Sequence, residues 1–254
     1  FTQLAQWINY DGYRAMFESS QTCRQGLLIW MSHPCWPSMV WQTYDYYFDP
    51  TAAYFGTKKA CEPVHIQYNP LAEKVQLVNI SRKDFTSVEA YAEVLDIYGR
   101  RISADTCTTP LPVDTTLNVM DVRVPEGQDA YYLRLSLKAD GEVLSENFYV
   151  RSAGDSGLKS LLSLPAAEVN VKTRFRKTDG TVTCNALVSN DSDVPALMIR
   201  LNLKGTDGEQ ILPAFYSDNY FHLMPGESRT VEISYRAEDA RGVRPVLETS
   251  WLND

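Results

Sequence analysis

Histidine and cysteine, the side chains that most often carry nucleophilic or metal chemistry, are few and scattered in this chain of 254 residues. The three histidines are His33, His65 and His222, and no G-x-S-x-G turn accompanies them, which argues against a serine hydrolase of that kind. The five cysteines include no C-x-x-C pair, so a zinc site is not indicated. We therefore expect structural histidines, buried free thiols, and neither a metal nor another cofactor.

Carboxylates are the other side chains that could do chemistry here. Glycoside hydrolysis, for example, needs two facing carboxyl groups, about 5–5.5 Å apart for retention of configuration and about 6.5–9.5 Å apart for inversion. From residue 64 onward, Asp and Glu fall mostly in predicted turns or on the polar side of alternating segments. This placement predicts a solvated surface and no catalytic pair.

Charge and aromatic content narrow the classes of partner. The net charge is −8, which argues against a nucleic acid or an anionic membrane surface as the partner. Four of the five tryptophans, Trp7, Trp30, Trp36 and Trp41, lie in the first 41 residues, so the start of the chain differs in kind from the rest.

The elements expected before residue 64 alternate between helix and strand. Apolar residues at helical spacing predict a helix over residues 2–20, and the wholly apolar run 27–31 predicts a buried parallel strand. A proline-containing loop follows, and residues 51–63 predict a short helix. Helix, buried strand and helix are typical of an α/β arrangement.

Beyond residue 64 the pattern changes to period two, which is typical of β-strands. Strands at roughly ten-residue spacing predict one β-sandwich over residues 64–151 and a second over 166–254, joined by a linker at 152–165. The two modules share this pattern but no evident residue-level repeat. Their expected role is scaffolding, because the candidate aromatic platforms, Tyr131–Tyr132 and residues 215–221, place neighbouring rings on opposite strand faces.

The segment from residue 26 to 67 carries motifs that resemble glycoside hydrolase family 2, in the branch of exo-β-glucosaminidases, mannosylglycoprotein endo-β-mannosidases and β-mannosidases. The matching pieces are G-L-L-I-W (26–30), W-P-S (36–38), Q-x-Y-D-Y-Y (42–47), D-P-T-A (49–52), Y-F-G (54–56) and A-C-E-P-V-H-I-Q (60–67). Further matches are the helix at 7–18, Y-S-D-N-Y-F (216–221), P-G-E-S (225–228) and Trp251.

The resemblance implies a mainly β fold: two immunoglobulin-like β-sandwiches preceded by the C-terminal α/β remnant of a (β/α)8 barrel. Residues 1–63 would then be the end of the TIM barrel, with its seventh helix, eighth strand and eighth helix. The family's two catalytic glutamates lie on earlier strands, so this chain is expected to hold no catalytic residue and to be inactive alone. The parent would be a retaining β-glycosidase, a hydrolase of carbohydrate metabolism, whose family is often exported to the periplasm or secreted.

The resemblance also implies which residues meet substrate, a β-linked glycoside or glycan. Trp30 would lie at the barrel mouth, with Trp36 and His33 in the loop that follows, whereas Trp41 is expected to pack internally. Glucosaminidase-like members have asparagines just before W-P-S, where this chain has the residues 32–35. That departure leaves β-mannosidase, β-galactosidase and β-glucuronidase activities open.

Two further expectations concern the isolated chain. A remnant of a barrel would expose apolar side chains, so residues 1–60 are expected to refold or to self-associate. The alternative function is a stand-alone carbohydrate-binding or cell-surface adhesion module. The predicted helix and buried strand at the start of the chain argue against that alternative.

Overall fold

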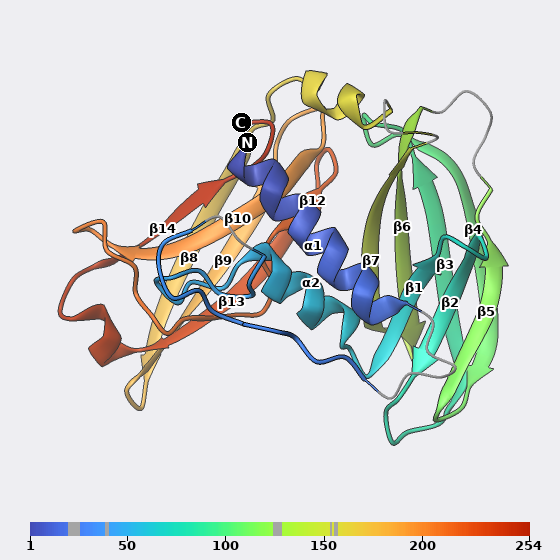
Figure 1. Cartoon of the computed structure of the whole chain (residues 1–254), viewed down its shortest axis with the longest axis horizontal. Coiled ribbons are helices and arrows are strands. Elements are labelled where there is room, and N and C mark those ends of the chain that lie inside the picture. Colours follow the sequence, from blue (N-terminus) through green and yellow to red (C-terminus); the bar gives the residue numbers. More distant parts are fainter. Residues whose placement is uncertain (20–25, 39–40, 124–128, 153, 155–156) are drawn as a thin grey trace. The chain divides into compact units, whose positions relative to one another are not determined.

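The computed structural model describes residues 1–19, 26–38, 41–123, 129–152, 154 and 157–254, and it is mainly β (Figure 1). Two α-helices come first, α1 (Thr2–Glu18) and α2 (Ala52–Ala60), and agree with the helices expected from the sequence. The chain divides into two compact units, and both helices cross the division. The residues of α1 up to Arg14 and of α2 up to Thr57 belong to one unit, and the last residues of each helix belong to the other. No helix in the described part of the chain is long and apolar enough to cross a membrane.

The first sandwich lies in the unit formed by residues 15–27 and 58–164. Its strands form two antiparallel sheets, with the orders β1-β2-β5 and β4-β3-β6-β7. These strands are β1 (Val64–Asn69), β2 (Lys74–Asn79), β3 (Phe85–Leu95), β4 (Arg101–Leu111), β5 (Thr115–Asp121), β6 (Ala130–Ala139) and β7 (Glu142–Ser152). A 3-10 helix, η1 (Gly157–Ser163), follows in the segment expected to be a linker.

Alternation of apolar residues explains how these two sheets pack. In β6, Leu133, Leu135 and Leu137 are fully buried, and the residues between them are less so. They share one hydrophobic core with Ile66 and Leu77 of the facing sheet. Side chains two residues apart lie on the same face of a strand, so this spacing gives each sheet one apolar face and explains the sandwich.

The second group of strands lies in the unit formed by residues 1–14, 28–57 and 165–254. Its sheets are antiparallel and have the orders β12-β10-β14 and β11-β13-β9-β8. The elements are β8 (Val169–Thr178), β9 (Thr181–Asn190), β10 (Ala196–Gly205), β11 (Phe215–Tyr216), β12 (Phe221–Leu223), β13 (Ser228–Arg236), the 3-10 helix η2 (Ala237–Ala240) and β14 (Pro245–Ser250).

Within that same unit, the N-terminal part of α1 contacts both α2 and the β12-β10-β14 sheet. The Gln6 side chain accepts a hydrogen bond from the Ala52 amide at 2.8 Å, and the Trp7 and His222 rings lie 5.3 Å apart. Gly56 sits so close to α1 that a Cβ there would lie 2.3 Å from the Tyr10 carbonyl oxygen. The absence of a side chain at Gly56 is therefore what permits this close helix contact.

Two expectations from the sequence are wrong. Residues 27–31 form no strand, and the Leu28 side chain is fully exposed. A parallel strand needs hydrogen-bonding neighbours on its edges, and the described residues provide none at this segment. Cys35 and Cys61 are exposed free thiols, since both lie outside the sheets, whereas Cys184 is buried as expected. Cys23 lies outside the described residues.

The two sandwiches do share a residue-level feature, which the strand pattern alone did not reveal. Asn79 ends β2 and Asn190 ends β9, and both side chains are fully buried. The Asn79 amide donates to the carbonyl oxygens of Lys83 and Leu111, and its Oδ1 accepts from Ser81. Asn190 makes the same set of bonds with Val194, Leu223 and Ser192. Each asparagine thus links the end of its strand to two backbone carbonyl groups of its own sandwich, an arrangement that we call an asparagine corner.

Candidate functional site

The residues expected to meet substrate lie in an irregular segment between α1 and α2. Trp30 and Trp36 are 79% and 68% exposed, so their indole faces are available to solvent. His33 is half-buried, and its ring stacks on Phe48 with centroids 4.2 Å apart. Trp41, expected to pack internally, is instead 51% exposed.

A tight loop, residues 45–49, holds His33 in place. The His33 Nε2 atom lies 3.2 Å from the Tyr46 carbonyl oxygen. Asp45 Oδ1 accepts hydrogen bonds from the amides of Tyr47 and Asp49, at 2.8 and 3.0 Å. An antiparallel bridge between Tyr44 and Pro50 closes the loop at its base. The sequence D-Y-Y-F-D therefore folds around its own first carboxylate, as Asx turns do.

His33 and this loop line a groove of about 990 Å³ in the same unit. The lining residues are His33, Asp45, Tyr46, Tyr47, Phe48, Arg200, Asn202, Lys204, Gly208, Glu209, Gln210, Leu212 and Arg241. Of the three residues expected to bind substrate, only His33 is among them. The structure therefore does not bring Trp30 and Trp36 to this groove.

The aromatic pairs suggested as platforms on the sandwiches are mostly unavailable to a ligand. Tyr131 and Tyr132 are both buried, and Tyr216 is buried with its hydroxyl accepting a hydrogen bond from the Leu203 amide. Only Phe215, at 66% exposed, faces solvent among the aromatics of 215–221. These positions therefore form no exposed aromatic platform on the strands.

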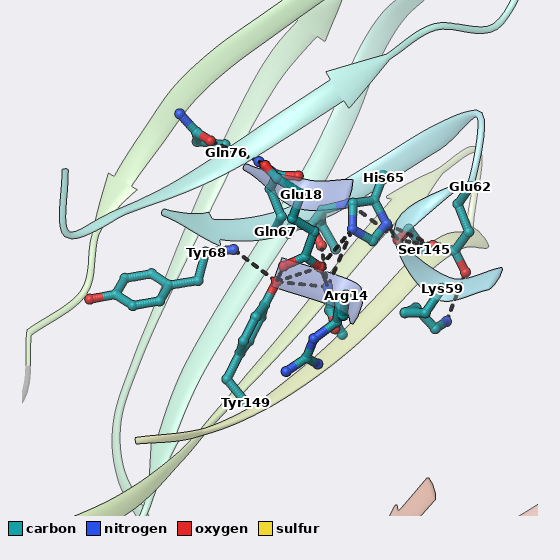
Figure 2. Close-up of polar contacts among 12 residues, drawn as sticks. Arg14, Glu18, Lys59, Glu62, His65, Gln67, Tyr68, Gln76, Ser145 and Tyr149 are labelled. Atoms are coloured by element: carbon teal, nitrogen blue, oxygen red, sulfur yellow. Dashed lines mark hydrogen bonds and ion pairs between the residues drawn. The ribbon is translucent and has the colours of Figure 1, made fainter. Parts of the chain in front are cut away.

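A buried polar cluster lies in the other unit, where the end of α1 meets β1 and β7 (Figure 2). The His65 ring sits between two carboxylates: its Nε2 is 3.1 Å from Glu18 Oε1, and its Nδ1 is 3.0 Å from Glu62 Oε2. The Tyr149 hydroxyl lies 2.9 Å from both Glu18 oxygens. Ser145 donates to Glu62 at 2.6 Å. We call these five residues the His65 cluster.

The geometry of the cluster favours the charged form of His65. Ionised carboxylates only accept hydrogen bonds, so two carboxylate partners require two N–H donors, and only the imidazolium form has both. Burial by itself lowers the pKa of His65, but the hydrogen bonds and charges of Glu18 and Glu62 outweigh it and raise that pKa. Burial likewise raises the pKa of Glu62, yet His65, Lys59 and Ser145 together hold it below its usual value.

The His65 cluster has the groups of a hydrolase but not the access. The Ser145 hydroxyl is 3.4 Å from His65 Nδ1, but His65 and Ser145 are only 1% and 3% exposed. A substrate cannot reach either side chain, so the arrangement is suited to binding one helix end to a sandwich. Among the described residues, no group of three or more His, Cys, Asp or Glu side chains could hold a metal ion.

Reasoning from the sequence did not find this cluster. Glu62 and His65 are three residues apart, as on one face of a helix. However, Glu62 precedes strand β1 and His65 lies within it, where buried positions are consecutive. The partner, Glu18, is 47 residues away from His65 and lies on a different element. Strand β1 alternates apolar and polar residues, which predicts an exposed polar face, so its sequence did not indicate that His65 and Gln67 are buried.

Residues 147–253 match the exo-beta-D-glucosaminidase Ig-fold domain. Over 91% of its length the chain is 31% identical to an exo-beta-D-glucosaminidase of Arthroderma benhamiae, and over all of it 25% identical to a mannosylglycoprotein endo-beta-mannosidase of Lilium longiflorum. The crystal structure of an exo-chitosanase from Amycolatopsis orientalis superposes on 98% of the chain with a TM-score of 0.87 and 27% identity.

The chain spans only part of these proteins: 29% of the fungal relative, 34% of the lily relative and 33% of the exo-chitosanase chain. A beta-D-mannosidase structure from Dictyoglomus thermophilum, 18% identical with a TM-score of 0.69, shares the fold. These matches confirm the resemblance that the motifs at 26–67 and 216–228 indicate.

Proposed function

We propose that this chain is the non-catalytic C-terminal portion of a retaining β-glycosidase of glycoside hydrolase family 2. The observation that carries the proposal is a match that covers 91% of this chain but only 29% of an exo-beta-D-glucosaminidase. Its role is to supply scaffold sandwiches, at residues 64–151 and 166–254 with a linker at 152–165, and one rim of the sugar site. The parent's substrate is a β-linked glucosaminide or mannoside.

Residues 1–63 are, in this proposal, the end of a (β/α)8 barrel. Helices α1 and α2 flank the apolar run 27–31, as the seventh and eighth barrel helices flank the eighth strand. Active sites of such barrels lie at the carboxyl ends of the strands, which is where Trp30 and the loop after it belong. The run becomes a strand only when a neighbouring barrel strand hydrogen-bonds to it.

Trp30, Trp36 and His33 contribute that rim of the sugar site. The two indoles are more than two-thirds exposed, and an indole face packs well against the C–H face of a pyranose. The His33 ring is oriented by its stacking on Phe48, and it joins the rim from the loop that follows Trp30. No side chain of this chain serves as acid, base or nucleophile, because the catalytic glutamates belong to earlier barrel strands.

Hydrolysis of nitrophenyl β-glycosides tests this function. We expect no activity from the 254-residue chain and activity from a version extended through the whole barrel. In the extended enzyme, Trp36→Ala is expected to lower kcat/KM by about tenfold, the equivalent of one aromatic contact of roughly 1.4 kcal/mol. Phe215→Ala, which removes an equally exposed ring from β11, serves as the matched control.

Two results would contradict the proposal. Hydrolysis by the 254-residue chain itself would mean that catalytic carboxylates are present here. Unchanged kinetics in the Trp30→Ala and Trp36→Ala enzymes would remove these residues from the sugar site while leaving the family relationship intact.

The same segment accounts for a second property of the isolated chain, self-association. Leu28, Trp30, Trp36 and Trp41 are all at least half exposed, and an apolar patch of this kind favours contact with a second copy. Sedimentation velocity should therefore show a concentration-dependent dimer, and a Leu28→Asp/Trp30→Ser variant should sediment as a monomer. A wild-type chain that is monomeric at all concentrations would exclude this association.

A further inference from the structure

We propose that the groove bounded by residues 45–48 and 208–212 is a second carbohydrate-binding site, which holds a β-linked oligosaccharide apart from Trp30 and Trp36. The site rests on the groove itself, whereas the class of ligand rests on the proposed function. Three features support it: preformed walls, exposed rings beside hydrogen-bonding groups, and a balanced charge.

Both walls of the groove are fixed before any ligand arrives. The Tyr44–Pro50 bridge closes one wall, and an antiparallel bridge between Lys204 and Gln210 closes the other. The buried carboxylate of Asp49 forms an ion pair with Arg200 of β10, which ties the first wall to the sheet. A preformed site loses little conformational entropy on binding, which is what a weakly binding sugar requires.

Phe48 has an unusual backbone conformation. Its φ is 68°, in the left-handed region that bulky residues rarely adopt. The loop nevertheless leaves this ring 64% exposed, beside Tyr47 at 61%. Burial therefore does not account for the strain, and strain of this kind is concentrated at functional sites. Exposed rings at the edge of a groove provide surfaces on which a pyranose can stack.

Polar groups for the sugar hydroxyls lie around these rings. Arg241 is exposed and donates to the Gln210 carbonyl oxygen at 3.3 Å, and a guanidinium has five N–H donors in all. Gln210 adds a partly exposed amide group to the lining, which can both donate and accept. Flat apolar faces bordered by such groups suit a polyhydroxylated ligand.

The charges of the groove argue against an anionic ligand. Arg200 is paired with Asp49, and Lys204 is paired with Glu248 at 2.5 Å. The carboxylates of Asp45 and Glu209 also line the groove and oppose the charge of Arg241. A phosphate or sulfate group would find no net positive field here, so a glycan without such groups is the better match.

Isothermal titration of the 254-residue chain with three β-1,4-linked hexaoses, of mannose, glucose and glucosamine, tests this site. We expect one hexaose to bind, and Tyr47→Ala to weaken that binding by about tenfold. Phe48→Gly should do the same, because glycine accepts the positive φ and only the ring is lost. Phe215→Ala, which removes an exposed ring outside the groove, should bind as the wild type does.

Several outcomes would overturn the inference. These are no binding of any hexaose, equal binding by the Tyr47→Ala and Phe48→Gly variants, and binding of inorganic phosphate in place of the hexaoses. Loss of binding in Trp36→Ala would also overturn it, since the sugar would then occupy the rim and not the groove. The kinetics of the extended enzyme decide the proposed function separately, so failure of one does not imply failure of the other.

Discussion

Replacing His65 with alanine is expected to lower the free energy of unfolding by about 3–5 kcal/mol. The substitution removes a cationic ring that contacts both Glu18 and Glu62. Glu18 is 8% exposed, so its carboxylate would stay buried with hydrogen bonds from Asn147 and Tyr149 but without a counter-charge from the imidazolium. Losing one partner of a buried pair costs far more than the pair itself contributes.

The distribution of tryptophans makes this effect measurable in one part of the chain. All five tryptophans belong to the unit formed by residues 1–14, 28–57 and 165–254, whereas the His65 cluster belongs to the other unit. Denaturant unfolding followed by far-ultraviolet circular dichroism should therefore shift in His65→Ala more than unfolding followed by tryptophan fluorescence. His33→Ala, a substitution of a partly exposed histidine, is the control and should change neither by more than about 0.5 kcal/mol.

A second substitution separates charge from packing. Adding Glu18→Gln to His65→Ala neutralises one of the two carboxylates that the ring contacts and should recover part of the lost stability. Additive losses in the double variant would show that His65 matters through its packing alone, which would contradict the charge argument.

The pH dependence of the wild type follows from the same groups. The raised pKa of His65 means that its contribution is complete below the unfolded value of 6.5 and is lost as pH rises through the folded value. The lowered pKa of Glu62 means that its contribution is complete above 4.5 and is lost as pH falls through the folded value. Both contributions are complete between those two values, and His65→Ala should flatten the alkaline side of the profile.

Replacing Gly56 with alanine is expected to be the second large effect, a loss of about 3 kcal/mol. The new Cβ would lie 2.3 Å from the Tyr10 carbonyl oxygen and 3.0 Å from the Tyr10 carbonyl carbon. These are backbone atoms, which cannot rotate away as a flexible side chain would, so the two helices must separate. Trp7 is buried one helical turn from Tyr10, and its fluorescence should report the shift.

Gly12→Ala provides a matched control for this prediction. Gly12 also lies in a helix, but nothing is within 4 Å of a Cβ added there. Alanine is the better helix former by roughly 0.5–1 kcal/mol, so this variant should be slightly more stable than the wild type. If Gly56→Ala behaved as Gly12→Ala does, the close helix contact would be wrong.

Much of the fold follows from sequence patterns because its elements are regular. Helical spacing in residues 2–20 and period two beyond residue 64 reflect which faces must be buried, and both patterns agree with the structure. The prediction of a strand at 27–31 was wrong, because an apolar run indicates only which side chains would be covered in a larger sheet. A strand also needs a hydrogen-bonding neighbour, and that information is not local.

The candidate sites show a similar division. Motifs drew attention to Trp30, His33 and Trp36, yet only His33 lies in the groove with Tyr47 and Phe48. Those two aromatics belong to a segment that the resemblance already singled out, but no periodicity indicates that a loop folded on its first carboxylate would expose them. The His65 cluster depends on contacts between residues up to 131 positions apart, as in the Glu18–Tyr149 pair. Residue spacing within one helix or strand does not indicate contacts between residues so far apart in the sequence.

The paired asparagine corners have a consequence for chemical modification. Asn79-Ile-Ser81 and Asn190-Asp-Ser192 both have the form Asn-x-Ser, which marks acceptors for N-linked glycans in secreted proteins. In the folded chain each side-chain nitrogen already donates to two backbone oxygens and is fully buried. A glycosyltransferase therefore has no access to either nitrogen once the sandwich has formed. In each triplet the serine hydroxyl donates to the asparagine oxygen, so the hydrogen bonds of the corner account for the Asn-x-Ser pattern.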